Sequence, residues 1–282
     1  MSKRILIFGA TGWLGKITLD YLNRYYPKYE IILVSSSSGN FNMGTRNYTT
    51  ISSQEALELK SQNIDFFLNY AFLTQDKIKK LGNSLYLKQT NKIIDFYKEF
   101  VNNNTVKKSL LISSGAVYWK NTYKENLYSL QKINQENDFL DSSKAKKIDY
   151  IIARVFAIIG NYYDPNKKYA FVDFVESAKL KKTINISSKN KVERSYLYFE
   201  SFLDYYFKTQ DFNKTIDAWN ENLDIVDLAN IIADSFGVKV NVIDEYYKQN
   251  KVDRYISKDD YFKNIAKAKI DDNLIRAIFL NP

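Results

Sequence analysis

The segment that most constrains the fold is residues 5–15, ILIFGATGWLG, in which four apolar residues run directly into a series of glycines. The apolar run is typical of a strand buried on both faces, and the residues that follow, KITLDYLNRYY, have apolar positions at helical spacing. On such a strand-to-helix turn, Gly9 permits a tight turn, Gly12 lets the backbone approach a pyrophosphate, and Gly15 lets helix and strand pack closely. The first N–H groups of the helix then face an anion. A tight turn without a ligand is the alternative, but this context favours a dinucleotide site.

The absence of two residue types restricts the chemistry. The 282 residues include no Cys and no His, which excludes disulfides, a cysteine nucleophile, His-dependent triads and His metal ligands, so no metal site is predicted. Acid–base chemistry near neutral pH must then use Tyr, Lys, Asp or Glu. No apolar run approaches the roughly 20 residues of a membrane span, and the chain begins with a strand rather than a signal peptide. These features predict a cytoplasmic protein without a membrane partner.

The net charge of +9 raises the question of a nucleic-acid partner. The lysines are scattered along the chain rather than clustered, so we expect no nucleic-acid binding. A basic surface also suits anionic small ligands such as nucleotides.

The end of the second predicted strand bears on the choice of cofactor. This strand covers residues 30–34 and is followed by Ser35 and Ser36, whereas an Asp or Glu at this place would bind the ribose 2′-hydroxyl and repel a 2′-phosphate. The serine hydroxyls and N–H groups could receive a phosphate, and Arg46 lies a short way on. This favours NADP(H) over NAD(H); alternatively, the serines are only a loop, as Gly39 and Asn40 suggest.

Strands and helices alternate along the first half of the chain. Strands are predicted at residues 48–51 and 64–72, and residues 109–118 are predicted to be a further strand with its exit. Residues 85–101 have the pattern of an amphipathic helix, and residues 127–139 are also predicted to be helical. This alternation predicts an α/β fold with a doubly wound parallel sheet. The end of the strand at 64–72 would then lie beside the dinucleotide.

A tyrosine and a lysine lie one turn apart on the second of these helices. Tyr128 and Lys132 share a helix face, and a neighbouring ammonium favours the phenolate and so lowers the pKa of a tyrosine. Ser114, at the end of the preceding strand, could bind the oxygen that gains or loses the proton. Because the chain has 23 Tyr, such a pair can occur by chance. Its position after a strand that ends in serine is what makes a catalytic role a reasonable prediction.

In this order, GATGWLG, NYA, SSGAVY and YSLQK with Glu136 resemble the extended short-chain dehydrogenase/reductase family, which includes nucleotide-sugar epimerases, dehydratases and ketoreductases. The resemblance continues through residues 148–160, which are similar to the family's sixth strand with its Arg154 and terminal Gly160, through ERSYLY at 193–198, and through the helix-like segment 223–237. Three features depart from the family pattern. Trp119 replaces a usual glycine, the segment before Tyr128 is short, and Ala157 replaces a substrate-binding asparagine. The compact members, such as the CDP-linked 3,6-dideoxysugar synthases, are the most similar.

The resemblance implies a Rossmann-type doubly wound parallel sheet with a small C-terminal substrate lobe. The dinucleotide-binding domain would cover residues 1–160, and the lobe mainly 161–282, with some segments returning to the first domain. Ser114, Tyr128 and Lys132 would be catalytic, and Ser114 and Arg194 would bind substrate. Alternatively, Arg194 forms a surface ion pair. The cofactor-binding residues would be Gly9, Thr11, Gly12, Trp13, Leu14, Gly15, Ser35, Ser36, Arg46, Tyr70, Ala71, Phe72, Tyr128 and Lys132.

The activity implied first is a nucleotide-sugar 4-ketoreductase that transfers hydride from NADPH to an NDP-4-keto-deoxysugar in surface-polysaccharide deoxysugar biosynthesis. An NAD-dependent nucleotide-sugar 4-epimerase is the alternative, and a dehydratase a more distant one. Two other classes remain: a dinucleotide sensor, which would not need Ser114, Tyr128 and Lys132 together, and an RNA-binding protein of the same fold. The sugar, the nucleotide base and the formation of a homodimer are left open.

Overall fold

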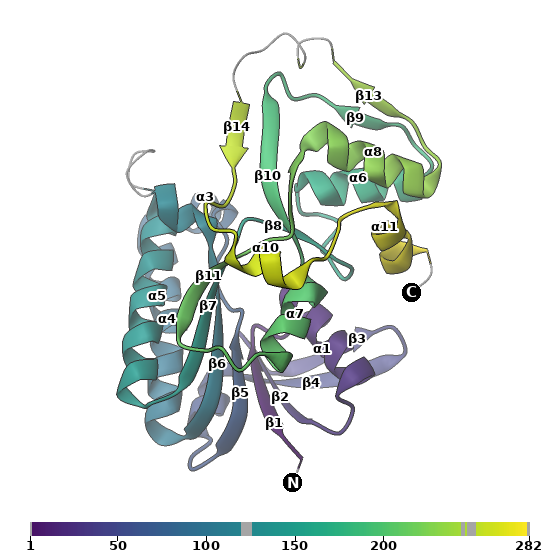
Figure 1. The fold of residues 1–282 in the computed structure, drawn as a ribbon. Coiled ribbons are helices and arrows are strands. Elements are labelled where there is room, and N and C mark those ends of the chain that lie inside the picture. The colour runs from purple at the N-terminus through teal and green to yellow at the C-terminus, as the bar shows by residue number, and fades with distance from the viewer. Residues whose placement is uncertain (1, 120–125, 244–245, 247–251, 281–282) are drawn as a thin grey trace. The chain divides into compact units, whose positions relative to one another are not determined.

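A computed structural model describes residues 2–119, 126–243, 246 and 252–280 (Figure 1). The chain divides into two compact units. The first comprises residues 1–154 and 208–216, and the second comprises residues 155–207 and 217–282. In the described part of the chain, no helix has both the length and the apolar character needed to cross a membrane.

An eight-stranded sheet is the centre of the first unit. Its order is β11-β7-β6-β5-β1-β2-β4-β3; β6, β5, β1, β2 and β4 pair in parallel with their neighbours in this run, and β3 and β4 form an antiparallel hairpin. The strands are β1 (Arg4–Phe8), β2 (Glu30–Ser35), β3 (Gly39–Met43), β4 (Arg46–Ser52), β5 (Asn63–Asn69), β6 (Thr105–Ser114), β7 (Asp149–Val155) and β11 (Lys214–Ala218).

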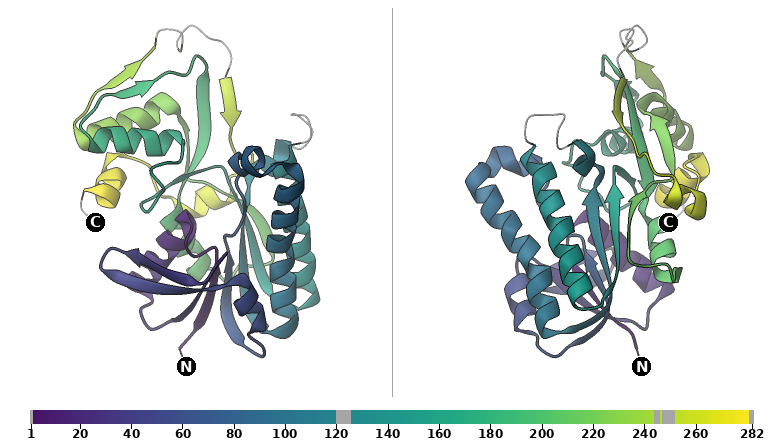
Figure 2. Two further views of the ribbon diagram at one scale, coloured as in Figure 1. Left: turned by 180° about the vertical axis from the view of Figure 1, so that it is seen from behind. Right: turned by 60° about the vertical axis from the view of Figure 1, so that its left-hand side comes forward.

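Helices cover this sheet and connect its strands. They are α1 (Trp13–Tyr25), α2 (Ser53–Glu58), α3 (Asp76–Leu81), α4 (Asn83–Asn103), the 3₁₀ turn η1 (Gly115–Trp119) and α5 (Leu127–Ala145). Figure 2 shows α4 and α5 side by side on one face and α1 on the other. Aromatic side chains fill the space beneath α4, where Phe67 packs edge-on against Tyr97 at 5.0 Å between ring centroids.

The strand order places a topological switch point between β1 and β5. From β1 the chain first builds outward through β2 and β4, and then crosses to the other side of β1 to build β5 and β6. In an open α/β sheet, a ligand binds at such a point, outside the carboxyl ends of the strands. The glycine turn after β1 lies at this position.

The second unit contains two small sheets and five helices in its described part. One sheet has the order β12-β10-β14, with β8 also paired to β10, and the other pairs β13 with β9. The strands are β8 (Ala157–Ile159), β9 (Ile184–Ile186), β10 (Lys191–Tyr198), β12 (Glu221–Asp224), β13 (Val240–Val242) and β14 (Val252–Tyr255). The helices are α6 (Ala170–Lys179), α7 (Phe199–Lys208), α8 (Ile225–Phe236), α10 (Tyr261–Ala266) and α11 (Asp272–Phe279).

Two elements differ from the sequence expectation. The predicted strand at 148–160 is two strands in different sheets, because the chain leaves β7 after Val155 and pairs again only as β8. Strand β3, which begins with Gly39 and Asn40, was not predicted, and it exists because it pairs residue by residue with β4.

Candidate active site

The glycine turn after β1 is shaped by close backbone contacts. Gly9 has φ +93°, and a Cβ there would lie 2.8 Å from the Ala71 nitrogen, at the exit of β5. A Cβ on Gly15 would lie 2.5 Å from the carbonyl oxygens of Gly9 and Ala10. Both positions therefore require glycine, because any side chain would collide with backbone.

Gly12 has a different environment, which suits an anion. It is the N-cap of α1 and makes no side-chain capping hydrogen bond, and an added Cβ would meet only the Gly9 carbonyl oxygen, at 3.2 Å. The positive dipole end of this 13-residue helix lies at the glycine turn, and the N-terminus of a helix favours an anion. The residues present at Gly12, Trp13 and Leu14 thus fit the pyrophosphate of a dinucleotide.

At the carboxyl end of β2, Ser35 and Ser36 differ in exposure. Ser35 is buried, and its hydroxyl donates to the Ser37 carbonyl oxygen at 2.5 Å and lies 3.3 Å from Thr50 Oγ1, whereas Ser36 is exposed. Arg46 begins β4, whose last residue, Ser52, pairs with Ser35. Six residues of strand span about 20 Å, so the structure does not bring Arg46 to this strand end.

The residues that follow β5 contribute backbone groups and the ring of Phe72 to the candidate site. The Tyr70 hydroxyl accepts a hydrogen bond from Thr18 of α1 at 3.0 Å, and burial raises the pKa of this tyrosine. The Ala71 carbonyl oxygen accepts from Gln135 of α5 at 3.3 Å. Phe72 lies beside the side chains predicted to be catalytic.

Lys132 is held at the end of β6. Its side chain is only 4% exposed, and its ammonium donates to the Ile112 carbonyl oxygen at 3.0 Å and to Gln135 Oε1 at 3.0 Å. The same ammonium lies 4.0 Å from the centre of the Phe72 ring. Burial lowers the pKa of Lys132 to about 7, although the negative charge of Glu136 opposes the shift.

Ser114 and Tyr128 lie at the adjoining ends of β6 and α5. Ser114 is the last residue of β6 and is buried, and its Oγ accepts from the Ala116 nitrogen at 3.2 Å. Asn126 caps α5 by accepting from the Tyr128 nitrogen at 3.1 Å, so the tyrosine stands in the first turn of the helix. The Tyr128 ring packs edge-on against Phe72 at 5.8 Å between centroids. Phe72 therefore contacts both Tyr128 and Lys132.

A second polar group joins α5 to β7 and η1. Arg154 donates to both carboxylate oxygens of Glu136, at 2.9 and 2.6 Å, and to the Tyr118 hydroxyl at 3.0 Å. Its guanidinium also lies 4.9 Å from the centre of the Tyr118 ring. Glu136 is one turn beyond Lys132, so this bidentate pair holds the helix that carries Tyr128 and Lys132 in place.

Sequence reasoning named Glu136 and Arg154 as motif positions but did not pair them, and it missed Gln135 and Tyr86. The Tyr86 hydroxyl donates to the Leu73 carbonyl oxygen at 2.9 Å. Burial raises the pKa of Tyr86, and the charge of Tyr128 adds to that shift. A tyrosine on the apolar face of a helix gives no sequence signal that its hydroxyl binds the Leu73 carbonyl oxygen.

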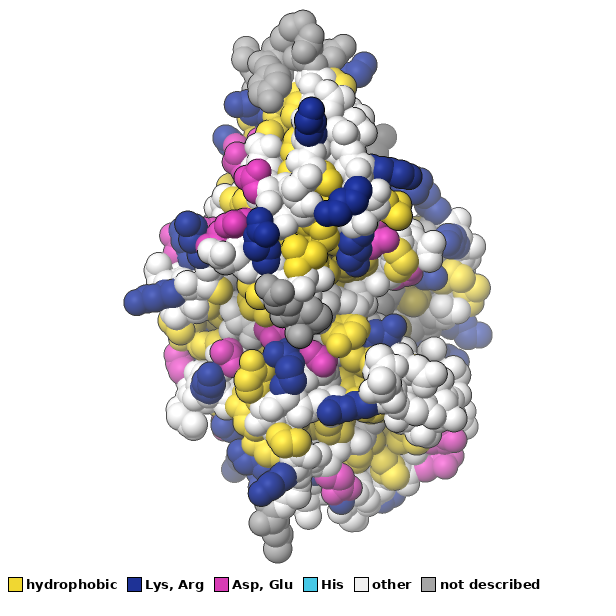
Figure 3. All heavy atoms as spheres, turned by 90° about the vertical axis from the view of Figure 1, so that its right-hand side faces the viewer, with side chains coloured by type: hydrophobic (Ala, Val, Ile, Leu, Met, Phe, Trp, Pro, Cys, Tyr) yellow, Lys and Arg dark blue, Asp and Glu magenta, His cyan; other side chains and the backbone are white. Residues whose placement is uncertain are grey.

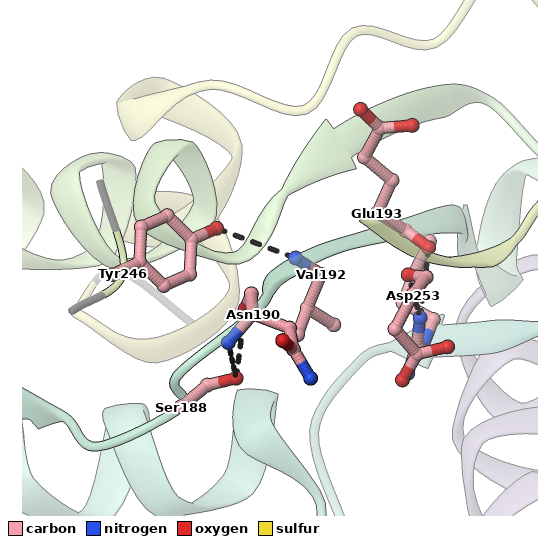
Figure 4. Close-up of polar contacts among 7 residues, drawn as sticks. Ser188, Asn190, Val192, Glu193, Tyr246 and Asp253 are labelled. Atoms are coloured by element: carbon pink, nitrogen blue, oxygen red, sulfur yellow. Dashed lines mark hydrogen bonds and ion pairs between the residues drawn. The ribbon is translucent and has the colours of Figure 1, made fainter. Parts of the chain in front are cut away.

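Arg194 belongs to the second unit and forms an ion pair on β10. It donates to the Glu193 and Asp253 carbonyl oxygens at 2.9 and 2.7 Å, and to the Asp253 carboxylate at 2.8 Å. Asp253 comes from β14, which pairs in parallel with β10. Figure 4 shows Asp253 beside Glu193. Next to this pair, Arg254 binds the Glu193 carboxylate at 2.6 Å. The ion pair named as an alternative role for Arg194 is therefore present.

The start of β10 has its own polar contacts. Figure 4 shows the Ser188 hydroxyl donating to the Asn190 carbonyl oxygen, at 2.8 Å, and accepting from its nitrogen, at 3.3 Å. The Tyr246 hydroxyl accepts from the Val192 nitrogen at 3.4 Å and donates to Asp224 at 2.5 Å. These contacts fix the strand on which Arg194 stands.

The surface charge shows no clustering on the face drawn in Figure 3. Lys and Arg side chains are distributed singly there, among acidic and apolar ones. Among the described residues, no group of three or more His, Cys, Asp or Glu has a metal-binding arrangement.

The parallel sheet, the switch point and the glycine turn define a Rossmann-type α/β protein, with a Ser-Tyr-Lys set at the carboxyl edge of its sheet. A family model confirms the class: the chain belongs to the NAD dependent epimerase/dehydratase family, whose model matches residues 5–216. This confirms the prediction of an extended short-chain dehydrogenase/reductase, an enzyme family whose cofactor is NAD. No curated protein matches the sequence significantly.

Solved structures of this family share the fold at low identity. A UDP-N-acetylglucosamine 4-epimerase from Methanobrevibacter ruminantium M1, in complex with UDP-N-acetylmuramic acid, has a TM-score of 0.68 at 19% identity, covering 98% of this chain and 96% of that one. An epimerase from Methanothermobacter thermautotrophicus has 0.72 at 14%, covering 99% and 93%. A UDP-glucuronic acid 4-epimerase from Bacillus cereus, with UDP-glucuronic acid and NAD, has 0.67 at 16%, covering 98% and 100%. These similarities confirm the predicted fold class.

Proposed function

We propose that the protein is a nucleotide-sugar 4-epimerase that oxidises and reduces carbon 4 of a nucleoside-diphosphate sugar. The observation that carries the proposal is the arrangement of Ser114, Tyr128 and Lys132, with Lys132 bound to the carbonyl oxygen two residues before Ser114. The similarity to solved 4-epimerases supports the same reaction.

The chain's own groups would manage the proton and the substrate. The bound dinucleotide would supply a hydride acceptor and donor for carbon 4. Tyr128 would take the proton of the 4-hydroxyl and later return it, and Ser114 would bind the same oxygen. Lys132 would favour the phenolate, since a free tyrosine has a pKa near 10. Epimerisation requires the hydride to return to the other face of carbon 4, so the keto sugar must turn within the site.

The second unit is our candidate for the substrate lobe, and Arg194 for the ligand of the diphosphate. A guanidinium binds phosphate oxygens in bidentate fashion, as it binds the Asp253 carboxylate and carbonyl here. Diphosphate binding at Arg194 would then replace the contact with Asp253.

A 4-ketoreductase that uses NADPH is the second candidate. The short segment between Trp119 and Leu127 favours it, because a tight rim would restrict the turning of a sugar ring; residues 120–125 of that segment lie outside the described residues. The preference for NADPH, the deoxysugar substrate and the cytoplasmic location remain predictions.

One experiment separates the two candidates. UDP- and dTDP-linked hexoses are incubated with the enzyme and NAD, and NDP-4-keto-6-deoxysugars with NADPH or NADH. Interconversion of two 4-epimers without net consumption of cofactor supports the epimerase, whereas stoichiometric loss of reduced cofactor with a 4-hydroxy product supports the reductase. In either assay Tyr128→Phe should lose most of its activity, and Tyr25→Phe, at an exposed position on α1, should keep it. Inactivity of the wild-type protein in both assays would contradict the proposal.

A further inference from the structure

The carboxyl ends of β2 and β4 form a polar edge beside the glycine turn. The two strands are parallel, with Val34 opposite Ile51 and Ser35 opposite Ser52, and the Val34 carbonyl oxygen accepts hydrogen bonds from the Gly9 and Ala10 nitrogens. In a Rossmann-type protein, the end of the second strand faces the adenosine ribose. Side chains that reach this edge therefore decide which ribose the site accepts.

A carboxylate reaches this edge from α2. Ser38, in the loop after β2, donates its hydroxyl to Glu55 Oε2, and the Ser52 nitrogen donates to the same oxygen at 2.7 Å. The Ser52 nitrogen also meets Ser38 Oγ at 3.1 Å, so the three groups converge on one point. The contact with Ser52 belongs to a capping box, but the contact with Ser38 does not, and it turns the carboxylate towards the end of β2.

Glu55 brings a negative charge to this edge. The hydrogen bond from Ser38 lowers the pKa of Glu55, and the Ser52 N–H contributes, so the exposed carboxylate is ionised at neutral pH. The hydroxyl of Ser35 is used within the protein, and Arg46, the cation expected to meet a 2′-phosphate, stands at the far end of β4. The polar edge thus offers an acceptor for a hydroxyl and repulsion for a phosphate.

We propose that Glu55 selects NAD(H) over NADP(H), by accepting a hydrogen bond from the 2′-hydroxyl of the adenosine ribose and by repelling a 2′-phosphate. The assignment rests on the proposed function, since it requires a dinucleotide on the glycine turn. It is the opposite of the NADP(H) preference predicted from the serines, because the fold brings Glu55 to the end of a strand that no acidic residue follows directly in the sequence.

The test changes the charge and keeps the local structure. Glutamine also serves at this position of a capping box, so Glu55→Gln retains the acceptor for the Ser52 N–H and removes the negative charge. Glu58→Gln is the matched control, because Glu58 is exposed on the same short helix. Copurifying nucleotide is identified by mass spectrometry and removed, and NAD⁺ and NADP⁺ are then titrated into each protein and followed by calorimetry.

We expect the wild-type protein to bind NAD⁺ at least about tenfold more tightly than NADP⁺, and Glu55→Gln to reduce this ratio about tenfold, mainly by tighter binding of NADP⁺. Glu58→Gln should leave the ratio unchanged. Because the carboxylate is exposed, the wild-type ratio should also shrink as salt is raised. If the wild-type protein prefers NADP⁺, or if NAD⁺ binds and Glu55→Gln leaves the ratio unchanged, the proposed role of Glu55 is wrong, but the proposed function is not affected. Failure of the wild-type protein to bind either dinucleotide overturns the proposed function, and this inference with it.

Discussion

Replacing Lys132 by methionine tests whether its ammonium is buried as the structure shows. In the unfolded chain the side chain has a pKa near 10.5, whereas burial lowers the pKa of Lys132 in the folded protein to about 7. Between these values the unfolded state binds a proton that the folded state does not, so this group makes stability rise with pH, by up to about 1.4 kcal/mol per pH unit. Below pH 7 both states are protonated, and Lys132 contributes no slope.

The magnitude follows from the two pKa values. From pH 7.5 to pH 9.5, the free energy of unfolding of the wild-type protein should rise by about 2.5 kcal/mol more than that of Lys132→Met. Urea unfolding at both pH values, followed by tryptophan fluorescence in the absence of dinucleotide, measures this difference, and all other titrating groups cancel. Lys144→Met, at an exposed position of α5, should retain the wild-type slope. Parallel pH dependences for wild type and Lys132→Met would refute the depressed pKa.

Three further variants test the turn, the chemistry and the ion pair. Gly15→Ala should lower the free energy of unfolding by about 3 kcal/mol, because its Cβ would lie 2.5 Å from two carbonyl oxygens, whereas Gly39→Ala, with nothing within 4 Å, should change it by less than about 0.5 kcal/mol; urea unfolding decides. Tyr128→Phe should reduce turnover by about 10²–10⁴ and leave dinucleotide affinity unchanged, and retention of most of kcat would remove this tyrosine from the chemistry. Arg154→Leu should cost about 3 kcal/mol by leaving a buried carboxylate unpaired, and adding Glu136→Leu should recover much of it; additive losses would show that the two side chains are not coupled.

Much of the first unit could be predicted because its signals are local. The run before Gly9 and the segment at 30–34 are strands, and the helices predicted at 85–101 and 127–139 are α4 and α5, the latter six residues longer. The alternation of strands and helices predicted that these strands form one parallel sheet. The split of residues 148–160 into β7 and β8 could not be predicted, because the apolar run is nearly continuous in the sequence. The break results from the pairing of β8 with β10 in another sheet.

The candidate site was predictable where adjacency in sequence coincides with adjacency in space. Tyr128 and Lys132 share one helix turn, and Lys132 binds the strand that ends in Ser114, as their order along the chain suggested. Phe72 contacts both Tyr128 and Lys132 because side chains pack between the exit of β5 and α5. The spacing of residues in the sequence does not predict such packing. The partner of Arg194 comes from β14, 59 residues later, so its ion pair with Asp253 has no local signature.

The β3–β4 hairpin shows how register can supply what a local motif lacks. In the usual arrangement, the acidic residue that binds the ribose follows the second strand directly, and here Ser35 stands there instead. The chain then forms the hairpin and returns parallel to β2, with Ser52 opposite Ser35, which brings Glu55 against Ser38, 17 residues earlier. A slip of one residue in this pairing would turn Ser52 to the other face of the sheet. The charge beside the ribose thus depends on the register of two strands, so inspection of the residues next to Ser35 could not reveal it.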